Sequence, residues 1–152
     1  MSLEEAVVLV VDDDEAQREL LAGFLEDVGA RVLQAADGQQ ALERLRRDSV
    51  DVVLTDVRMP RMGGEELLQT VVGENPEVGV ILVTAYGSID SAVSCLKKGA
   101  LDYLLKPLDL GRVEHAVRRA VEQRRLEREN RELRRRLGEV ESVPGIVTSG
   151  AG

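Results

Sequence analysis

The chain has 152 residues, a formal net charge of −8 and 43% hydrophobic residues, but only two tyrosines, one phenylalanine and no tryptophan. These values predict one compact domain with an aliphatic core, and they argue against a nucleic-acid-binding surface spread over the whole chain. A single cysteine, Cys95, excludes an internal disulfide and a cysteine metal cluster. No stretch approaches the roughly 18 apolar residues of a membrane span. We therefore expect a cytoplasmic protein.

Five short apolar segments alternate with five helical patterns along the chain. Strands are predicted at 6–11, 31–35, 50–55, 78–84 and 101–105. Helices are predicted over 20–28, 38–47, 64–72 and 88–98, and from 109 to about 137. Asp14, Ser88 and Asp109 are candidate helix caps, and Gly29, Gly73 and Gly99 stand at expected helix ends. The alternation predicts an α/β fold, a doubly wound parallel sheet with helices on both faces.

Polar side chains follow four of these strands where each strand ends. They are Asp12 and Asp13, Asp56, Thr84 and Lys106. The carboxyl ends of parallel strands meet at one edge of the sheet, which is where ligands bind in such folds. Three carboxylates at one edge repel each other unless a cation is present, and Mg²⁺ with oxygen ligands is the usual solution. A lysine and a hydroxyl beside them suit a phosphoryl group, so Asp56 is a candidate nucleophile that would form an aspartyl phosphate.

Each of these residues also has a purely structural interpretation. Asp12 and Asp13 could cap the first helix, as Asp14 is expected to do. Thr84 could be an ordinary strand residue and Lys106 a solvated one. Because Thr84 and Lys106 are expected at the same edge of the sheet as the carboxylate of Asp56, we favour a phosphoryl-binding site over these alternatives.

The segments VVDDDEAQR, LTDVRMP, TAYGSIDSAV and KKGALDYLLKP together resemble the receiver domain of bacterial two-component response regulators. The resemblance covers about residues 5–122, and the motifs agree in type, order and approximate spacing. It implies a flavodoxin-like sheet of five strands in the order 2-1-3-4-5. It also implies a signalling protein rather than an enzyme, phosphorylated by a sensor histidine kinase and capable only of self-catalysed phosphotransfer and slow autodephosphorylation.

The resemblance assigns a metal site to the carboxylates. Asp56 would accept the phosphoryl group. Asp13, Asp56 and the backbone carbonyl of Arg58 would bind Mg²⁺, with Asp12 contributing through water.

The resemblance assigns the phosphoryl oxygens to Thr84 and Lys106. Tyr103 would be a switch residue that turns inward with Thr84, although a half-buried strand tyrosine without a switching role is the alternative. The bond from Lys106 to Pro107 is often cis in this family, whereas most X–Pro bonds are trans.

Two positions that vary in the family hold bulky side chains here. Arg58 lies two residues after the phosphoacceptor and Tyr86 two residues after Thr84. Both flank the path of a hydrolytic water, so they are expected to tune dephosphorylation and to prolong the life of the phosphoaspartate.

The last helical pattern continues about fifteen residues beyond the end of a typical receiver. Leu126, Asn130, Leu133 and Leu137 follow at 4-3-4 spacing, which predicts a coiled-coil linker over 123–138 and a symmetric homodimer. Residues 112–137 carry ten arginines and five glutamates, a net charge of +5 that leaves −13 for the rest. These charges fit solvated flanks with Glu–Arg pairs, and the interleaved glutamates argue against DNA binding. The alternative is a lone arginine-rich helix.

The segment TAYGSIDSAVSCLKKGALDYLLKP followed by RRLERENRELRRRL resembles the regulatory end of NtrC-type, sigma-54-dependent activators. In those proteins a receiver and a coiled coil precede an AAA+ ATPase domain and a DNA-binding domain. The sequence contains no phosphate-binding GxxxxGK motif. We therefore expect a regulatory fragment in which 139–152 is a flexible tail leading to the ATPase domain, and phosphorylation alters dimer packing to control transcription.

Two other functions remain as alternatives. A haloacid-dehalogenase-like phosphohydrolase also uses an aspartyl phosphate, but it needs an aspartate where Arg58 stands and a cap domain for which there is no room. A stand-alone interaction module would use the receiver and the coiled coil as its whole output.

Overall fold

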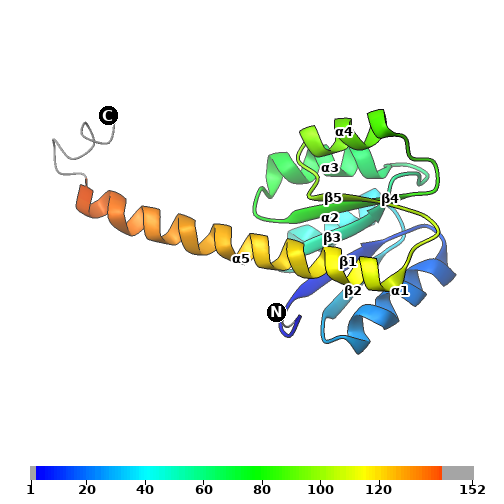
Figure 1. Cartoon of the computed structure of the whole chain (residues 1–152), viewed down its shortest axis with the longest axis horizontal. Helices are drawn as coiled ribbons and strands as arrows, with labels where there is room; N and C mark the ends of the chain where they lie inside the picture. The colour runs from blue at the N-terminus through cyan, green and yellow to red at the C-terminus, as the bar shows by residue number, and fades with distance from the viewer. Residues whose placement is uncertain (1–2, 142–152) are drawn as a thin grey trace.

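Strands and helices alternate through the structure, a computed structural model that describes residues 3–141 (Figure 1). The strands are β1 (Val7–Val11), β2 (Arg31–Ala35), β3 (Val52–Asp56), β4 (Gly79–Thr84) and β5 (Asp102–Leu105). The helices are α1 (Glu15–Asp27), α2 (Gly38–Arg47), α3 (Gly64–Glu74), α4 (Ile89–Lys97) and α5 (Leu110–Glu141).

The five strands form one sheet in the order β2-β1-β3-β4-β5, and every neighbouring pair is parallel. The predicted doubly wound sheet of order 2-1-3-4-5 is confirmed. All five strands therefore end at one edge, and β1 and β3 lie side by side at its centre.

Alternate side chains of the central strands enter two separate cores, because successive residues of a strand point to opposite faces of the sheet. Val8 and Val10 of β1 pack with α1 and α5, whereas Leu9 and Val11 pack with α2, α3 and α4. Figure 1 shows the two helical layers on either side of the sheet. Val8, Leu9 and Val10 have no exposed surface, so β1 is buried on both faces as its apolar run predicts.

Some element boundaries differ from the sequence prediction. Gly73 does not end α3, which continues to Glu74 and is capped by Asn75. Ala6 is excluded from β1 because its N–H donates to the Leu3 carbonyl in a turn. Gly29 and Gly99, in contrast, have φ values of 110° and 113° just after α1 and α4, where a residue with a Cβ would be strained.

Asp14 caps α1 as predicted: its side chain accepts a hydrogen bond from the N–H of Gln17 at 3.1 Å. The substitution Asp14→Ala is expected to lower the free energy of unfolding by about 1 kcal/mol, because a backbone donor of the first turn loses its partner. Urea unfolding followed by circular dichroism measures this loss. Asp14→Asn keeps an acceptor oxygen and should stay close to the parent chain; an equal loss in both variants would contradict the capping role.

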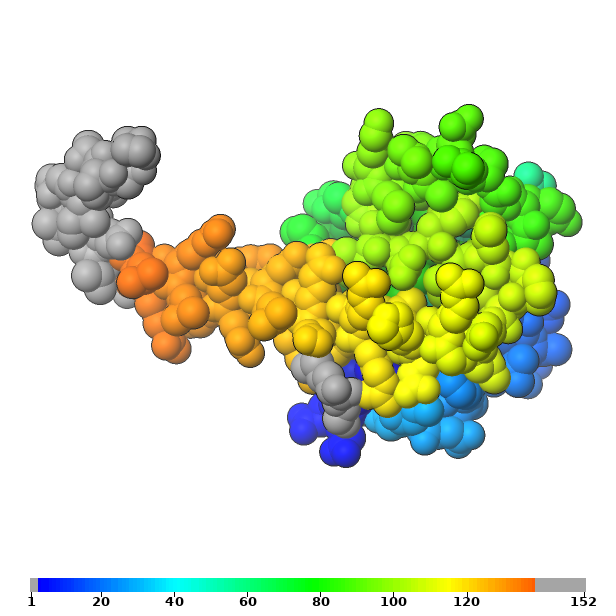
Figure 2. Space-filling view, in the orientation of Figure 1, coloured from blue at the N-terminus to red at the C-terminus, as the bar shows by residue number. Residues whose placement is uncertain are grey.

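Helix α5 is much longer than the other helices and projects beyond the sheet (Figures 1 and 2). It starts after Asp109, whose side chain accepts from the N–H groups of Gly111 and Arg112. It passes the predicted end near Leu137 and includes residues 139–141 of the predicted tail, while 142–152 lie outside the described residues. None of the described helices is both long and apolar enough to cross a membrane.

Candidate functional site

The carboxyl edge of the sheet gathers the polar residues singled out in the sequence. Asp12 and Asp13 follow β1, and Asp56 is the last residue of β3. Thr84 ends β4, and Lys106 follows β5. The parallel order of the strands places these residues on one edge.

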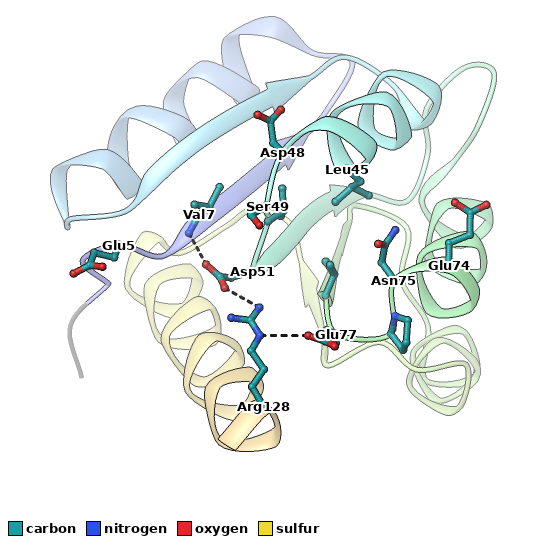
Figure 3. Close-up of a pocket in the computed structure, with 13 residues that line it drawn as sticks. Glu5, Val7, Leu45, Asp48, Ser49, Asp51, Glu74, Asn75, Glu77 and Arg128 are labelled. Atoms are coloured by element: carbon teal, nitrogen blue, oxygen red, sulfur yellow. Dashed lines mark hydrogen bonds and ion pairs between the residues drawn. The ribbon is translucent and has the colours of Figure 1, made fainter. Parts of the chain in front are cut away.

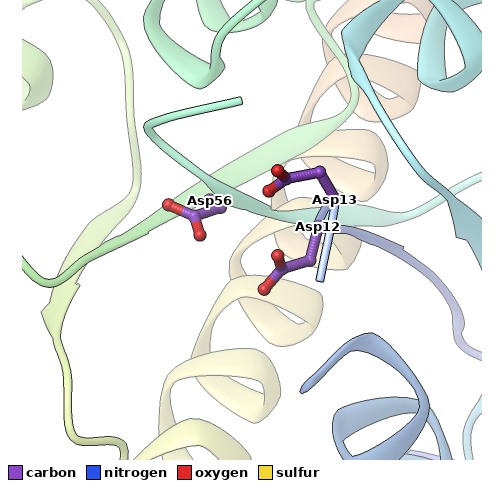
Figure 4. Close-up of side chains that lie close together, drawn as sticks. All are labelled: Asp12, Asp13 and Asp56. Carbon is purple, nitrogen blue, oxygen red and sulfur yellow. The ribbon is translucent and has the colours of Figure 1, made fainter. Parts of the chain in front are cut away.

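The three carboxylates form a compact group (Figure 4). One oxygen from each of Asp12, Asp13 and Asp56 lies within 4.8 Å of the others. Ligands of an octahedral Mg²⁺ ion lie about 3.0 Å apart when adjacent and about 4.2 Å apart when opposite, since each is about 2.1 Å from the ion. The three carboxylates would therefore have to move closer together to bind the ion directly, whereas a carboxylate that binds through water can stay further away. The all-oxygen donor set fits this ion.

Lys106 supplies the positive charge of the site. Its Nζ donates to Asp56 Oδ2 at 2.9 Å and lies 3.8 Å from Asp12 Oδ2. Burial of the ammonium lowers its pKa, but the hydrogen bond and charge of Asp56, together with the charges of Asp12 and Asp14, outweigh this effect, and the net pKa is raised. Lys106 is therefore a cation at neutral pH, in direct contact with the candidate phosphoacceptor.

Asp12 is the most buried of the three carboxyl groups, with 3% of the residue exposed. Burial raises its pKa, and the charges of Asp56 and Asp13 add to this effect. The N–H of Asp14, which donates to Asp12 Oδ1 at 2.9 Å, and the charge of Lys106 act in the opposite direction. The negative charge of Asp12 is thus held at a net cost that a bound cation would remove.

The substitution Asp12→Asn is therefore expected to stabilise the fold at pH 7 when no divalent ion is present. The pKa of Asp12 is higher in the folded chain than in the unfolded chain, so at pH values between the two the folded chain binds more protons. The free energy of unfolding of the parent chain therefore falls as pH rises through this window. Asparagine removes that dependence. Melting temperatures measured with chelator should favour the variant at pH 7, and the difference should shrink as pH falls towards 4. A variant that is less stable at neutral pH would contradict this account.

Thr84 and Tyr103 have separate partners in this structure. The buried Oγ1 of Thr84 accepts from the N–H of Tyr86 at 3.0 Å, which leaves its hydroxyl hydrogen for another acceptor. Tyr103 is half-buried, and its hydroxyl lies 3.1 Å from Ser91 Oγ in α4. The switch role of Tyr103 stays a prediction.

Arg58 and Tyr86 contact each other, which the sequence analysis did not foresee. The guanidinium carbon of Arg58 lies 4.3 Å from the centre of the Tyr86 ring, a cation–π geometry. The backbone N–H of Arg58 also donates to Asp56 Oδ1 at 3.1 Å. The stacked pair therefore joins the loop after β3 to the loop after β4, next to the candidate phosphoacceptor Asp56. The position of the Arg58 carbonyl as a metal ligand stays a prediction.

The predicted coiled-coil seam faces solvent in the single chain. Leu126, Leu133 and Leu137 expose 58%, 54% and 53% of their surface, and Asn130 is also exposed. Glu–Arg pairs are present on the helix, as between Arg124 and Glu127, but four arginines also reach the receiver. These arginines are Arg124, Arg125, Arg128 and Arg131. Their spacing along one side of the helix could have indicated such contacts, but they were interpreted as solvated.

Comparisons with known proteins agree with this geometry. A profile of the response regulator receiver domain matches residues 8–118. The chain is 44% identical over 126 residues to the transcriptional regulatory protein ZraR of Klebsiella oxytoca, covering 83% of this chain and 28% of ZraR. It is 38% identical to the DNA-binding transcriptional regulator NtrC of Escherichia coli K12, covering 78% and 25%.

A solved structure shows the same similarity. NtrX of Brucella abortus, crystallised with ADP, superposes with a TM-score of 0.81 and 34% identity over 91% of this chain and 30% of NtrX. The chain spans between a quarter and a third of the length of these relatives.

Proposed function

Because the chain belongs to the response regulator receiver domain family, we propose that it is a phosphorylation-dependent switch in which Asp56 accepts a phosphoryl group from a sensor histidine kinase. The observation that carries the proposal is the contact of Lys106 Nζ with Asp56 Oδ2 at 2.9 Å, beside two further carboxylates. This arrangement combines a nucleophile, a cation and a set of oxygen ligands at one exposed edge.

The chemistry follows from the positions of the side chains. A carboxylate oxygen of Asp56 forms a bond to phosphorus while the bond from phosphorus to the donor histidine nitrogen breaks and the imidazole leaves with the electron pair. Asp13, Asp56 and the Arg58 carbonyl would hold Mg²⁺, with Asp12 contributing through water, and the bound ion would neutralise charge on the phosphoryl oxygens. Lys106 then moves its hydrogen bond from Asp56 to a phosphoryl oxygen, and the free hydroxyl hydrogen of Thr84 serves as a second donor.

Thr84 and Tyr103 would transmit the conformational change from the phosphorylation site to the surface of the domain. If Thr84 turns towards the phosphoryl group, its bond to the Tyr86 N–H is lost and the loop after β4 is released. Tyr103 would then exchange its contact with Ser91 of α4 for an inward position. Both movements change the surface formed by α4, β5 and α5.

The output of the switch would be the packing of a homodimer through the seam of α5. The seam offers three exposed leucines and one asparagine at the spacing of a two-stranded coiled coil. By similarity to ZraR and NtrC, which are named as transcriptional regulators, the receiver would control sigma-54-dependent transcription through an AAA+ domain of the full-length protein. This role is a cytoplasmic one and assigns no nucleic-acid or membrane contact to residues 5–138.

Light scattering with a beryllofluoride–Mg²⁺ mixture, which mimics an aspartyl phosphate, tests the proposal. We expect a change in the mass or assembly of the protein that disappears in Asp56→Ala. A constant dimer in all samples would make the coiled coil a fixed scaffold, and a constant monomer would exclude it. Failure to bind either Mg²⁺ or beryllofluoride would refute the phosphorylation switch itself.

A further inference from the structure

The amino-terminal edge of the sheet, opposite the site of Asp56, is held to α5 by arginines. Arg124 NH1 donates to the carbonyl of Pro76 at 2.9 Å, and Arg125 NH2 to the carbonyl of Glu4 at 3.2 Å. Arg128 and Arg131 form ion pairs with carboxylates at the same edge. We call Arg124, Arg125, Arg128 and Arg131 the arginine clamp.

Arg128 enters a hollow at this edge that is lined by five carboxylates (Figure 3). Its guanidinium lies 2.9 Å from Asp51 Oδ1, while Asp51 Oδ2 accepts the N–H of Val7 at 2.8 Å. The same arginine approaches Glu77 at 3.8 Å, and Arg131 pairs with Glu77 at 2.6 Å. Arg128 is the one cation among the lining residues. The charges of the edge and of the helix are therefore complementary.

Arg124 is packed against the sheet rather than solvated, since only 12% of its side chain is exposed. A Cβ atom built on Gly79, the first residue of β4, would lie 3.3 Å from Arg124 Nε and 2.6 Å from a methyl carbon of Leu101. A side chain at Gly79 would thus clash with Leu101 and crowd the Arg124 stem, so the glycine allows Arg124 to pack closely against β4. Such a fit is shape complementarity in addition to charge.

The clamp lies on the face of the helix opposite to the seam. Successive residues of an α-helix are 100° apart, so Arg124, Arg128 and Arg131 fall within about 60° of one another, and Arg125 lies about 100° from Arg124. The seam residues Leu126, Asn130, Leu133 and Leu137 fall on the other side of the helix axis. In a heptad with Asn130 at position a, the clamp arginines occupy positions b, c and f, which face away from a coiled-coil partner.

We propose that the amino-terminal edge of the receiver is a docking surface for residues 124–131 of α5. Docking extends the rigid unit of the receiver from about residue 122 to Arg131 and turns the seam outward. Where it concerns a second chain, this inference rests on the coiled coil proposed above: the two receivers then lie on the outer sides of the paired helices. The docking itself is a property of one chain.

Amide hydrogen exchange tests the docking in the background Leu133→Lys, which removes a seam leucine and so favours the monomer. We expect the amides of 124–131 to exchange at least about tenfold more slowly than those of 134–141. Arg128→Gln with Arg131→Gln should remove most of that difference. The matched control is Arg134→Gln with Arg135→Gln, which removes the same charge from two arginines that follow the clamp on the same helix and should leave exchange at 124–131 unaltered.

A charge exchange separates docking from general destabilisation. Arg131→Glu alone should accelerate exchange at 124–131, and adding Glu77→Arg should restore protection, while the amides of β1 and β3 stay protected throughout. Equal exchange in the two halves of the helix, or equal effects of the clamp and control pairs, would overturn the proposal. Light scattering of the parent chain tests the dimer independently: a monomer with protected 124–131 amides refutes the coiled coil and supports the docking.

Discussion

The substitution Asp56→Asn is expected to abolish labelling of the protein by acetyl phosphate, a small phosphoryl donor that needs no kinase. The amide has nearly the same shape, and its oxygen can still accept the N–H of Arg58 as Asp56 Oδ1 does. It is not a nucleophile, however, so no bond to phosphorus forms. Mass spectrometry of the intact protein with Mg²⁺ should find the phosphorylated species only in the parent chain.

Asp51→Asn is the matched control for this experiment. Asp51 directly precedes β3, and Asp56 ends it, so the same substitution is made at opposite ends of one strand. The control should be labelled at the rate of the parent chain. Labelling of Asp56→Asn, or loss of labelling in both variants, would contradict the assignment of Asp56 as the phosphoacceptor.

The phosphorylated protein is expected to be long-lived, with a half-life well beyond seconds, and the combination Arg58→Ala with Tyr86→Ala should shorten it at least about tenfold. The stacked pair joins the loops after β3 and β4, where it would cover the approach that a water molecule needs for attack on the phosphoryl group. A tenfold change corresponds to about 1.4 kcal/mol of activation free energy, which matches the steric and cation–π contribution of such a pair. Loss of the phosphoryl group from purified, labelled protein with Mg²⁺ measures the rate.

Two variants control for this effect. Tyr86→Phe keeps the ring and should retain the long half-life. Arg61→Ala removes an arginine from the same loop that pairs with Asp37 instead of stacking on Tyr86, and it should have little effect. A parent half-life of only seconds, or an unchanged rate in the double variant, would refute the role of the pair.

The pattern of apolar residues was sufficient to predict a parallel sheet of five strands, but not every helix end. The strand order was predicted from the resemblance to receiver domains. The apolar runs of β1 and β4 are buried on both faces, so their hydrophobicity is a direct consequence of their place in the sheet. Gly73 was predicted to end α3 and lies inside it, whereas Gly29 and Gly99 follow helices with positive φ. Glycine permits both conformations, so tertiary contacts decide which one it adopts.

The positions of the site residues follow from strand order alone, because each of them ends or follows a strand. Contacts between loops and between distant segments cannot be predicted from strand order. The stacking of Arg58 on Tyr86 joins two loops whose relative positions no local pattern encodes. Arg128 was interpreted as a solvated flank because a helix sequence shows its own charges but not the carboxylates of Asp51 and Glu77 that it meets.

Because α5 continues beyond Arg131, a small rotation of the helix at Arg131 produces a larger displacement at its far end, where a partner helix would pack. Ten residues separate Arg131 from Glu141, which at 1.5 Å per residue is a lever arm of about 15 Å. A tilt of roughly 10° about Arg131 moves the helix axis at Glu141 by roughly 3 Å, the rise of two helical residues. Side chains that interdigitate across a coiled coil do not tolerate such an offset. A tilt of that size at the receiver would therefore be amplified mechanically, without any unfolding of the helix.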